Sequence, residues 1–367
     1  MHDQPQITLR GHGASSVSSL CFLRKNLLVS CDSSEQGCLL LWNLDSRKLV
    51  AKLYSGDESD DSSSERRSSI HNGGLFIDRF STCEDKFVYQ QRNGMSVYDI
   101  ETMKTVSFFE TDSTGFCQAT TCDNLVIYPH KSSSFKIWDH RCDPSTTMIF
   151  SAFRAETDEK HGMLCSLSAN ICGNNLAVAC GMESGNIFCH YFSSSAVLTT
   201  VTASSMNSLS VGTDPVLCMD LIVSSGDDES SCVGVAGLAG DALEIAQKSR
   251  PEDRGTIVTF KVKATCIGDQ NKPTLKLRQR MSTCEVGGTA AGGKPGVACC
   301  RFRKDGRIFA TGGWDRRVRV FSRSGRSLAI LKGSKESVTS LDWNPWIQQM
   351  MATGSADGRI SLWDISF

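Results

Sequence analysis

Residues 310–321 read ATGGWDRRVRVF, a turn followed by a run that alternates arginine and valine. Strict alternation is typical of a β-strand with one face buried. The same pattern returns near the end of the chain in GRISLWDI (358–365), where a Gly-containing turn precedes an alternating strand that carries Trp363 near its end. The equivalent position in the first stretch is Phe321, so the Trp-Asp pair at 314–315 belongs to the preceding turn.

Five further runs fit this template, and the seven equivalent positions are Trp42, Tyr98, Trp138, His190, Phe260, Phe321 and Trp363. Their spacings are 56, 40, 52, 70, 61 and 42 residues. The shortest match the roughly 40–45 residues of one four-stranded WD40 blade, and loop insertions account for the longer ones. We therefore predict an all-β fold, a seven-bladed WD40 β-propeller that forms a single domain over residues 1–367.

The two ends of the chain complement each other. ITLRGH (7–12) is similar to the outer strand and following Gly-His of such a repeat, whereas the last repeat stops at Phe367 after its third strand. We expect the N-terminal strand to complete the last blade, because closure of the ring removes exposed strand edges.

The repeats are degenerate. Regular WD repeats join a His, a turn Asp, a Ser or Thr and the closing Trp by hydrogen bonds. In this sequence Gly-His occurs only at 11–12, and the turn aspartate only as Asp315 and Asp357. We expect most blades to be held by apolar packing, with His190 as a packed substitute for Trp.

Two insertions are predicted to be loops. Residues 55–69 are acidic and Ser-rich with almost nothing to bury, so we expect a disordered loop in which Ser59 and Ser62 are candidate phosphorylation sites. Residues 263–295, locally basic and then Gly-rich, are predicted to be a flexible loop.

Charge and cysteine usage exclude several classes of protein. The 39 Lys and Arg nearly balance 40 Asp and Glu, which disfavours direct binding of nucleic acid by bulk charge. We find no secretory signal and no apolar run long enough to span a membrane. The 17 Cys include no Cys-x-x-Cys pair, so we expect reduced, buried thiols, no metal and no cofactor, and a nuclear or cytoplasmic location.

No nucleophile motif such as G-x-S-x-G occurs, so the chain is predicted not to be an enzyme. Propellers more often present loops to partners. The sixth repeat is rich in Arg, and we predict a partner-binding site at Trp314, Arg316, Arg317 and Arg319, with Trp314 exposed in its turn beside basic side chains.

Three C-terminal segments carry a family resemblance: 294–321, LAILKGSKESVTSLDW (328–343) and MATGSADGRISLWDI (351–365). They resemble the WD-repeat family of guanine nucleotide-binding protein β-subunit-like protein 1, also called ASTRA-associated protein 1. The resemblance implies a non-catalytic scaffold of the ASTRA complex, linked to chromatin remodelling and, through the Triple-T chaperone adaptor, to maturation of PI3-kinase-like kinases. It also implies a monomer within a hetero-complex.

Two alternatives remain. A G-protein β-subunit-like signalling protein would pair with a γ-subunit through an N-terminal coiled-coil helix, but the predicted first strand begins near Ile7 and leaves no room for it. An enzyme or a nucleic-acid binder is disfavoured by the missing motifs and the balanced charge.

Overall fold

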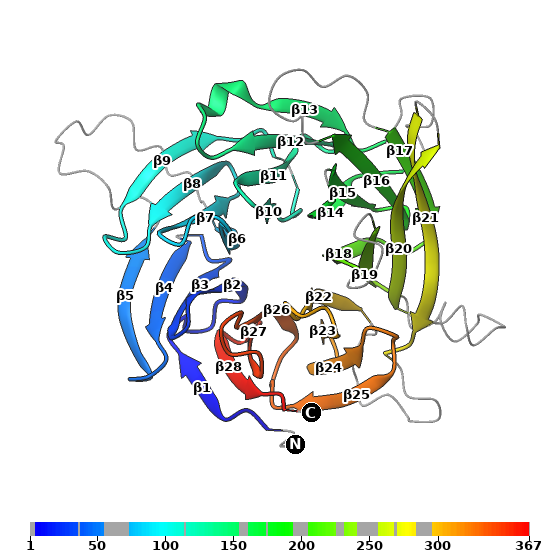
Figure 1. Ribbon diagram of the computed structural model, residues 1–367. Helices are drawn as coiled ribbons and strands as arrows, with labels where there is room; N and C mark the ends of the chain where they lie inside the picture. The colour runs from blue at the N-terminus through cyan, green and yellow to red at the C-terminus, as the bar shows by residue number, and fades with distance from the viewer. Residues whose placement is uncertain are drawn as a thin grey trace.

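The computed structural model describes residues 4–35, 37–54, 73–113, 115–153, 161–173, 175–193, 205–224, 231–240, 256–267, 270–283 and 296–366. Its strands form seven four-stranded antiparallel sheets, arranged as blades around a central channel (Figure 1). The predicted seven-bladed β-propeller is confirmed. The residues 55–69, with Ser59 and Ser62, lie outside the described residues.

Within each blade the strands follow one another from the channel outward. Blade 1 consists of β2 (Val17–Arg24), β3 (Leu27–Asp32), β4 (Cys38–Asn43) and β5 (Lys48–Tyr54). Blade 2 consists of β6 (Gly74–Arg79), β7 (Lys86–Gln91), β8 (Gly94–Asp99) and β9 (Thr105–Glu110). Blade 3 consists of β10 (Thr120–Cys122), β11 (Leu125–His130), β12 (Ser134–Asp139) and β13 (Met148–Ser151). A short 3-10 helix, η1 (Pro144–Thr146), precedes β13.

Blades 4 to 7 follow the same order. Blade 4 consists of β14 (Leu164–Cys172), β15 (Asn175–Met182), β16 (Asn186–Ser193) and β17 (Ser205–Ser210), and blade 5 of β18 (Val216–Val223), β19 (Ser231–Leu238), β20 (Ile257–Ile267) and β21 (Gln270–Met281). Blade 6 consists of β22 (Val297–Phe302), β23 (Ile308–Gly313), β24 (Arg317–Ser322) and β25 (Ser327–Lys332). Blade 7 consists of β26 (Val338–Trp343), β27 (Met350–Ser355), β28 (Arg359–Asp364) and β1 (Ile7–Arg10).

The N-terminal strand closes the ring, as predicted. β1 pairs with β28 in antiparallel register from Ile7 opposite Leu362 to Arg10 opposite Arg359. The last blade is thus built from both ends of the chain, which lie close together in Figure 1. This pairing covers the strand edge that a linear stack of blades would leave exposed.

All seven predicted closing positions lie on the third strand of a blade and are buried. The substitution at His190 keeps this packing: its ring lies 5.3 Å from Phe135 and 6.1 Å from Phe192, and its Nε2 lies 3.1 Å from the carbonyl oxygen of Ala152. Burial lowers the pKa of His190 to about 4. A neutral imidazole therefore fills the position that Trp occupies in other blades.

β-bulges recur at two places in the blades. In six blades the second residue of the first strand is skipped in the register, namely Ser18, Leu75, Cys165, Leu217, Ala298 and Thr339. In four blades a residue of the outer strand is skipped beside the closing position, namely Val50, Val106, Arg278 and Leu328. Because a bulge re-aims its side chain, each of these residues leaves the regular pleat.

The prediction of a flexible loop at 263–295 is wrong for its first part, because residues 263–267 and 270–281 belong to strands. β20 and β21 form one long hairpin, paired from Ile257 opposite Met281 to Ile267 opposite Gln270. The basic residues there belong to paired strands, whose alternating apolar positions, such as Val262 and Leu275, pack into the blade. Residues 284–295 lie outside the described residues.

The expectation of reduced cysteines also needs a correction. Cys172, at the end of β14, and Cys232, near the start of β19, form a disulfide between blades 4 and 5, with their Cα atoms 6.4 Å apart. Thirteen other cysteines, those whose side chains the structure describes, are free. In the described part of the chain no helix is long and apolar enough to cross a membrane.

Candidate partner-binding surfaces

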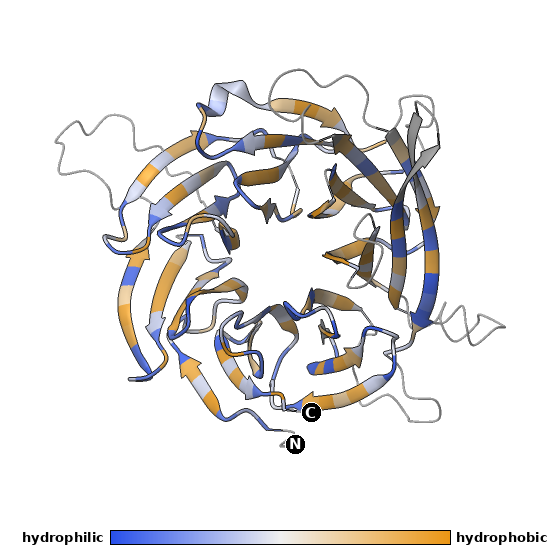
Figure 2. Cartoon of the chain, viewed as in Figure 1, coloured by the Kyte–Doolittle hydropathy of each residue, from blue (hydrophilic) through white to orange (hydrophobic). Residues whose placement is uncertain are grey.

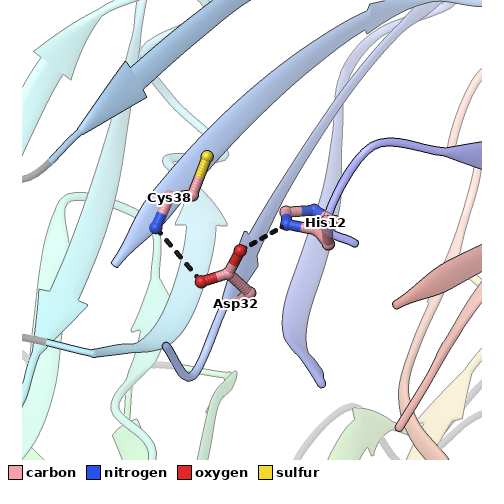
Figure 3. A group of neighbouring side chains, drawn as sticks. All are labelled: His12, Asp32 and Cys38. Carbon is pink, nitrogen blue, oxygen red and sulfur yellow. Dashed lines mark hydrogen bonds and ion pairs between the residues drawn. The ribbon is translucent and has the colours of Figure 1, made fainter. Parts of the chain in front are cut away.

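Blade 1 keeps a complete polar network. His12 Nδ1 lies 2.8 Å from Asp32 Oδ2 and His12 Nε2 lies 2.7 Å from Ser30 Oγ, which also accepts a hydrogen bond from Trp42 Nε1 at 3.0 Å. Figure 3 shows His12 and Asp32 facing each other beside Cys38. The sequence analysis missed Asp32 because it stands ten residues before Trp42, at the end of β3 and not in the turn.

The order Ser30–His12–Asp32 is that of a hydrolase triad, but its setting is structural. Ser30 is fully buried, and its hydroxyl oxygen is engaged by the indole of Trp42. A nucleophile must reach a substrate, and this one cannot. The network therefore holds β3, β4 and the segment after β1 together.

The sulfur of Cys38 adds a third donor type near the same pair, and donor atoms of His12, Asp32 and Cys38 lie within 4.8 Å of one another. Hydrogen bonds already engage both ring nitrogens of His12, and the remaining carboxylate oxygen of Asp32 accepts bonds from the backbone nitrogens of Ser34 and Cys38, each at 3.2 Å. Burial raises the pKa of the Cys38 thiol to about 11. These hydrogen bonds and the burial of the thiol explain why the three side chains lie together inside blade 1.

The predicted site in blade 6 is only partly brought together. Trp314 is half-buried, not exposed: its ring lies so close to Gly296 that a Cβ there would approach Trp314 Cε3 to 2.3 Å. The backbone nitrogen of Trp314 also donates to Gly296 O at 2.9 Å. Trp314 folds over the segment that enters β22, while Arg316, two residues later, is exposed.

Arg319 is not a surface residue, which corrects the prediction for this position. Only 4% of Arg319 is exposed, and its guanidinium donates to both carboxylate oxygens of Asp315 and to Thr283 O at 2.7 Å. Alternation does put Arg317 and Arg319 on one face of β24, but the segment after β21 covers that face at Arg319. Trp314, Arg316 and Arg317 remain in the accessible turn.

The central channel holds a cavity that the sequence did not indicate. Its volume is about 270 Å³, and the bulged residues of five first strands line it: Ser18, Cys165, Leu217, Ala298 and Thr339. Phe116, 78% exposed, also contributes to the lining. The channel is therefore lined mainly by small side chains.

A second cavity, of about 310 Å³, contains a charged cluster. Arg301 of β22 lies 3.2 Å from Asp78 of β6 and 3.7 Å from Asp220 of β18. Burial raises the pKa of Asp220 and of Asp342, on β26, to about 6. Although burial lowers the pKa of Arg301, the charges of these three aspartates raise it overall. Four blades thus contribute to one cluster.

Backbone contacts explain why the aspartates sit there. Asp220 accepts a hydrogen bond from the backbone nitrogen of Phe302 in blade 6 at 2.7 Å, and Asp342 accepts one from Phe22 in blade 1 at 3.0 Å. Each carboxylate therefore links its own first strand to the next blade. Single aspartates on separate strands gave no such signal in the sequence.

Comparisons with known proteins agree with this architecture. The family model described as WD domain, G-beta repeat matches residues 3–43, 288–322 and 325–364. Among solved structures, the Cps50 (Swd1) β-propeller domain of Myceliophteria thermophila superimposes with a TM-score of 0.63 at 15% identity and covers 99% of both chains. A chain of the Mitotic Checkpoint Complex gives a TM-score of 0.64 at 10% identity, over 100% of this chain and 93% of that one. At these identities the likeness shows the fold.

The curated relatives include proteins of two descriptions that bear on function. Mouse guanine nucleotide-binding protein subunit beta-like protein 1 is 23% identical over 98% of this chain and 96% of its own length. ASTRA-associated protein 1 of Schizosaccharomyces japonicus is 42% identical over 20% of each chain, and that of Aspergillus flavus is 34% identical over 21% of this chain and 27% of its own. These two ASTRA-associated proteins thus each match about a fifth of this chain. The chain is thus a seven-bladed β-propeller that carries WD repeats at the matched residues, and it is similar to guanine nucleotide-binding protein subunit beta-like protein 1 and, over a shorter stretch, to ASTRA-associated protein 1.

Proposed function

We propose that this chain is a non-catalytic protein-interaction scaffold that joins the subunits of a larger assembly. The observation that carries the proposal is the closed ring, in which β1 and β28 complete the last blade, combined with homology that extends over 98% of the chain. WD propellers typically work as scaffolds, because a rigid ring holds many loops in fixed positions. The buried setting of Ser30 and His12 supports a structural role for the polar network of blade 1.

We infer more specifically a component of an ASTRA-type complex, linked to chromatin remodelling and, through a Triple-T-type chaperone adaptor, to maturation of PI3-kinase-like kinases. The name of the ASTRA-associated relatives supports this assignment. The chain would be a monomer within this hetero-complex and would be found in nucleus and cytoplasm. Imaging of a fluorescently tagged chain at native expression tests the location, and confinement to any other compartment contradicts it.

The turn at 314–317 is a proposed contact surface. Arg316 is exposed and Arg317 half-buried beside the partly covered ring of Trp314. Arg316→Glu tests this surface better than a change at the half-buried Trp314, because the Arg316 side chain makes few contacts. Its Nη1 donates to the carbonyl oxygen of Lys335, at 3.3 Å. Loss of a captured partner with an unchanged melting temperature supports this surface, whereas unchanged capture removes it.

Affinity capture from the native organism, followed by crosslinking mass spectrometry, tests the function. We expect remodeller or kinase-maturation subunits crosslinked to the loops of the propeller. Capture of neither group contradicts the ASTRA assignment.

A G-protein β-like signalling role is the second candidate, favoured by the full-length alignment to the mouse β-like protein. In the same capture experiment, recovery of a γ-type subunit instead of ASTRA-type subunits decides for it.

A further inference from the structure

Arginines gather on the outer rim where blade 5 meets blade 6. Arg278 lies on β21, Arg307 in the turn before β23, and Arg323 and Arg326 in the turn between β24 and β25. The backbone nitrogen of Arg323 donates to Arg307 O at 2.7 Å. We call these four residues the arginine rim.

The turn that carries Arg323 and Arg326 packs on the end of β21. Gly325, with a φ of 82°, lies so close to Gln279 that a Cβ there would approach Gln279 Oε1 to 2.3 Å. Figure 1 shows the end of β21 beside the start of β25 at the lower right of the ring, and Figure 2 shows hydrophilic residues there. Burial and then the nearby charge of Arg278 lower the pKa of Arg323. Four positive charges from two blades therefore share one surface.

Arg278 stands at a β-bulge on an exposed stretch of β21. Thr259 pairs with Gln279 and Phe260 with Leu277, so Arg278 is the residue that the register skips. The equivalent bulged residues of blades 1, 2 and 6 are Val50, Val106 and Leu328, all of them apolar. Because a bulge turns its extra residue out of the pleat, blade 5 presents a cation where the others present an aliphatic side chain.

Three of the four guanidinium groups of the rim, those of Arg278, Arg307 and Arg326, have no ion-pair partner within the described part of the chain. The acidic residue in the turn, Asp305, pairs with Arg303, whose Nη2 lies 2.6 Å from its Oδ2, and it also attracts the charge of the rim residue Arg307. Among the described residues, Arg278, Arg307 and Arg326 are all exposed, and their side chains make no ion pair or hydrogen bond. Arg323 donates to Ser224 Oγ at 2.8 Å. These guanidinium groups differ from those of Arg301 and Arg319, which are committed to internal carboxylates.

We propose that the arginine rim binds a carboxylate-rich segment of a partner protein, and this proposal rests on the scaffold function. Guanidinium groups fit carboxylates through paired hydrogen bonds. The groups stand on one strand and two turns of an outer rim, so they match carboxylates spaced along a peptide better than one converging anion. A net charge of −1 for the whole chain disfavours a long nucleic acid as the ligand.

Binding should be modest and sensitive to salt. Exposed ion pairs contribute about 0.2–1 kcal/mol each, and ionic strength screens them over a Debye length of about 8–10 Å near physiological salt. The rim would thus add specificity to a larger interface and would not hold a partner alone.

Fluorescence anisotropy with the purified full chain and a labelled peptide of alternating Glu and Gly tests the rim. We expect saturable binding at an ionic strength of about 0.02 M, weakened at about 0.15 M, and no binding of a Ser-Gly peptide. Arg307→Glu with Arg326→Glu should weaken binding about tenfold or more. The matched control, Arg92→Glu with Lys104→Glu, makes the same charge change at exposed residues in loops of another blade and should have little effect.

Three outcomes overturn the proposal: no binding of the acidic peptide, equal weakening by the control pair, or rim-dependent binding of a single-stranded oligonucleotide in preference to the peptide. Melting temperatures of both double variants show that each is folded. Capture experiments separate the two proposals. A wild-type chain that binds the peptide but captures no partner contradicts the scaffold function, and a rim variant that loses the peptide but keeps every partner crosslink contradicts the rim as a docking surface.

Discussion

Arg319 donates to both carboxylate oxygens of Asp315, at 3.1 and 2.6 Å, and to Thr283 O of the preceding segment. This buried ion pair does in blade 6 what the His12–Asp32 pair does in blade 1: it ties the turn of a blade to the segment that precedes its first strand. We therefore expect the pair to be needed for the stability of blade 6.

Arg319→Met should lower the free energy of unfolding by about 3 kcal/mol, because it leaves Asp315 in a largely covered site without its partner. Arg316→Met, at the exposed position of the same turn, should change it by less than about 0.5 kcal/mol. Urea denaturation of both variants measures the difference. Equal effects would show that Arg319 is no more structural than Arg316.

Arg301→Met should also destabilise the protein by about 3 kcal/mol at pH 7, since Asp78 and Asp220 lose the cation between them. Part of this loss should be recovered at pH 5, because burial raises the pKa of Asp220 to about 6 and its protonated carboxyl group no longer needs the cation. Denaturation at the two pH values checks this, and a loss independent of pH contradicts the assignment.

Asp342→Asn isolates one of these carboxyl groups. The pKa of Asp342 is raised to about 6 from 3.8, so the folded chain binds its proton at a higher pH than the unfolded chain does. The contribution of Asp342 to stability therefore rises as the pH falls from about 6 towards 4. The buried His190, with its pKa lowered to about 4 from 6.5, acts in the opposite direction.

Comparing wild type with Asp342→Asn cancels the effect of His190. We expect the stability difference between the two proteins to depend on pH in the window from 6 to 4, with wild type gaining as the pH falls. The amide can still accept the hydrogen bond from Phe22 N, so a uniform offset at every pH would argue against the titration.

The Cys172–Cys232 disulfide closes a loop of 60 residues across the boundary of blades 4 and 5. Chain-entropy arguments give about 4 kcal/mol for such a crosslink. Reduction should lower the stability of wild type by about that amount and leave Cys172→Ala unaffected. The control Cys189→Ala, at a buried free thiol, should keep the response to reductant. A wild type insensitive to reductant would contradict the crosslink.

A double-mutant cycle between His12→Ala and Ser30→Ala should give a coupling energy of about 1 kcal/mol, because the two residues share a hydrogen bond in a buried network. The pair His12→Ala and Cys189→Ala, in different blades, should be additive within about 0.5 kcal/mol. Additivity in both cycles would show that the network of blade 1 does not act as a unit.

The sequence predicted the number, order and closure of the blades because the evidence for each is local. Alternation of apolar and polar residues indicates which face of a strand is buried, and turn residues indicate where the strand ends. The closing position recurs even where His190 replaces Trp. ITLRGH could be assigned to the last blade because it matches the strand that the final repeat lacks.

What covers each face was decided only by the tertiary structure. Alternation placed Arg317 and Arg319 on one side of β24, but Thr283, from the preceding blade, makes Arg319 internal. The ring brings together carboxylates from β6, β18 and β26 around Arg301, although the chain separates them by more than a hundred residues. Arg278 stands at a β-bulge that only the strand register reveals, and its charge acts on Arg323 of blade 6. Local sequence determines which side of a strand a residue faces, whereas the closed ring determines what it meets there.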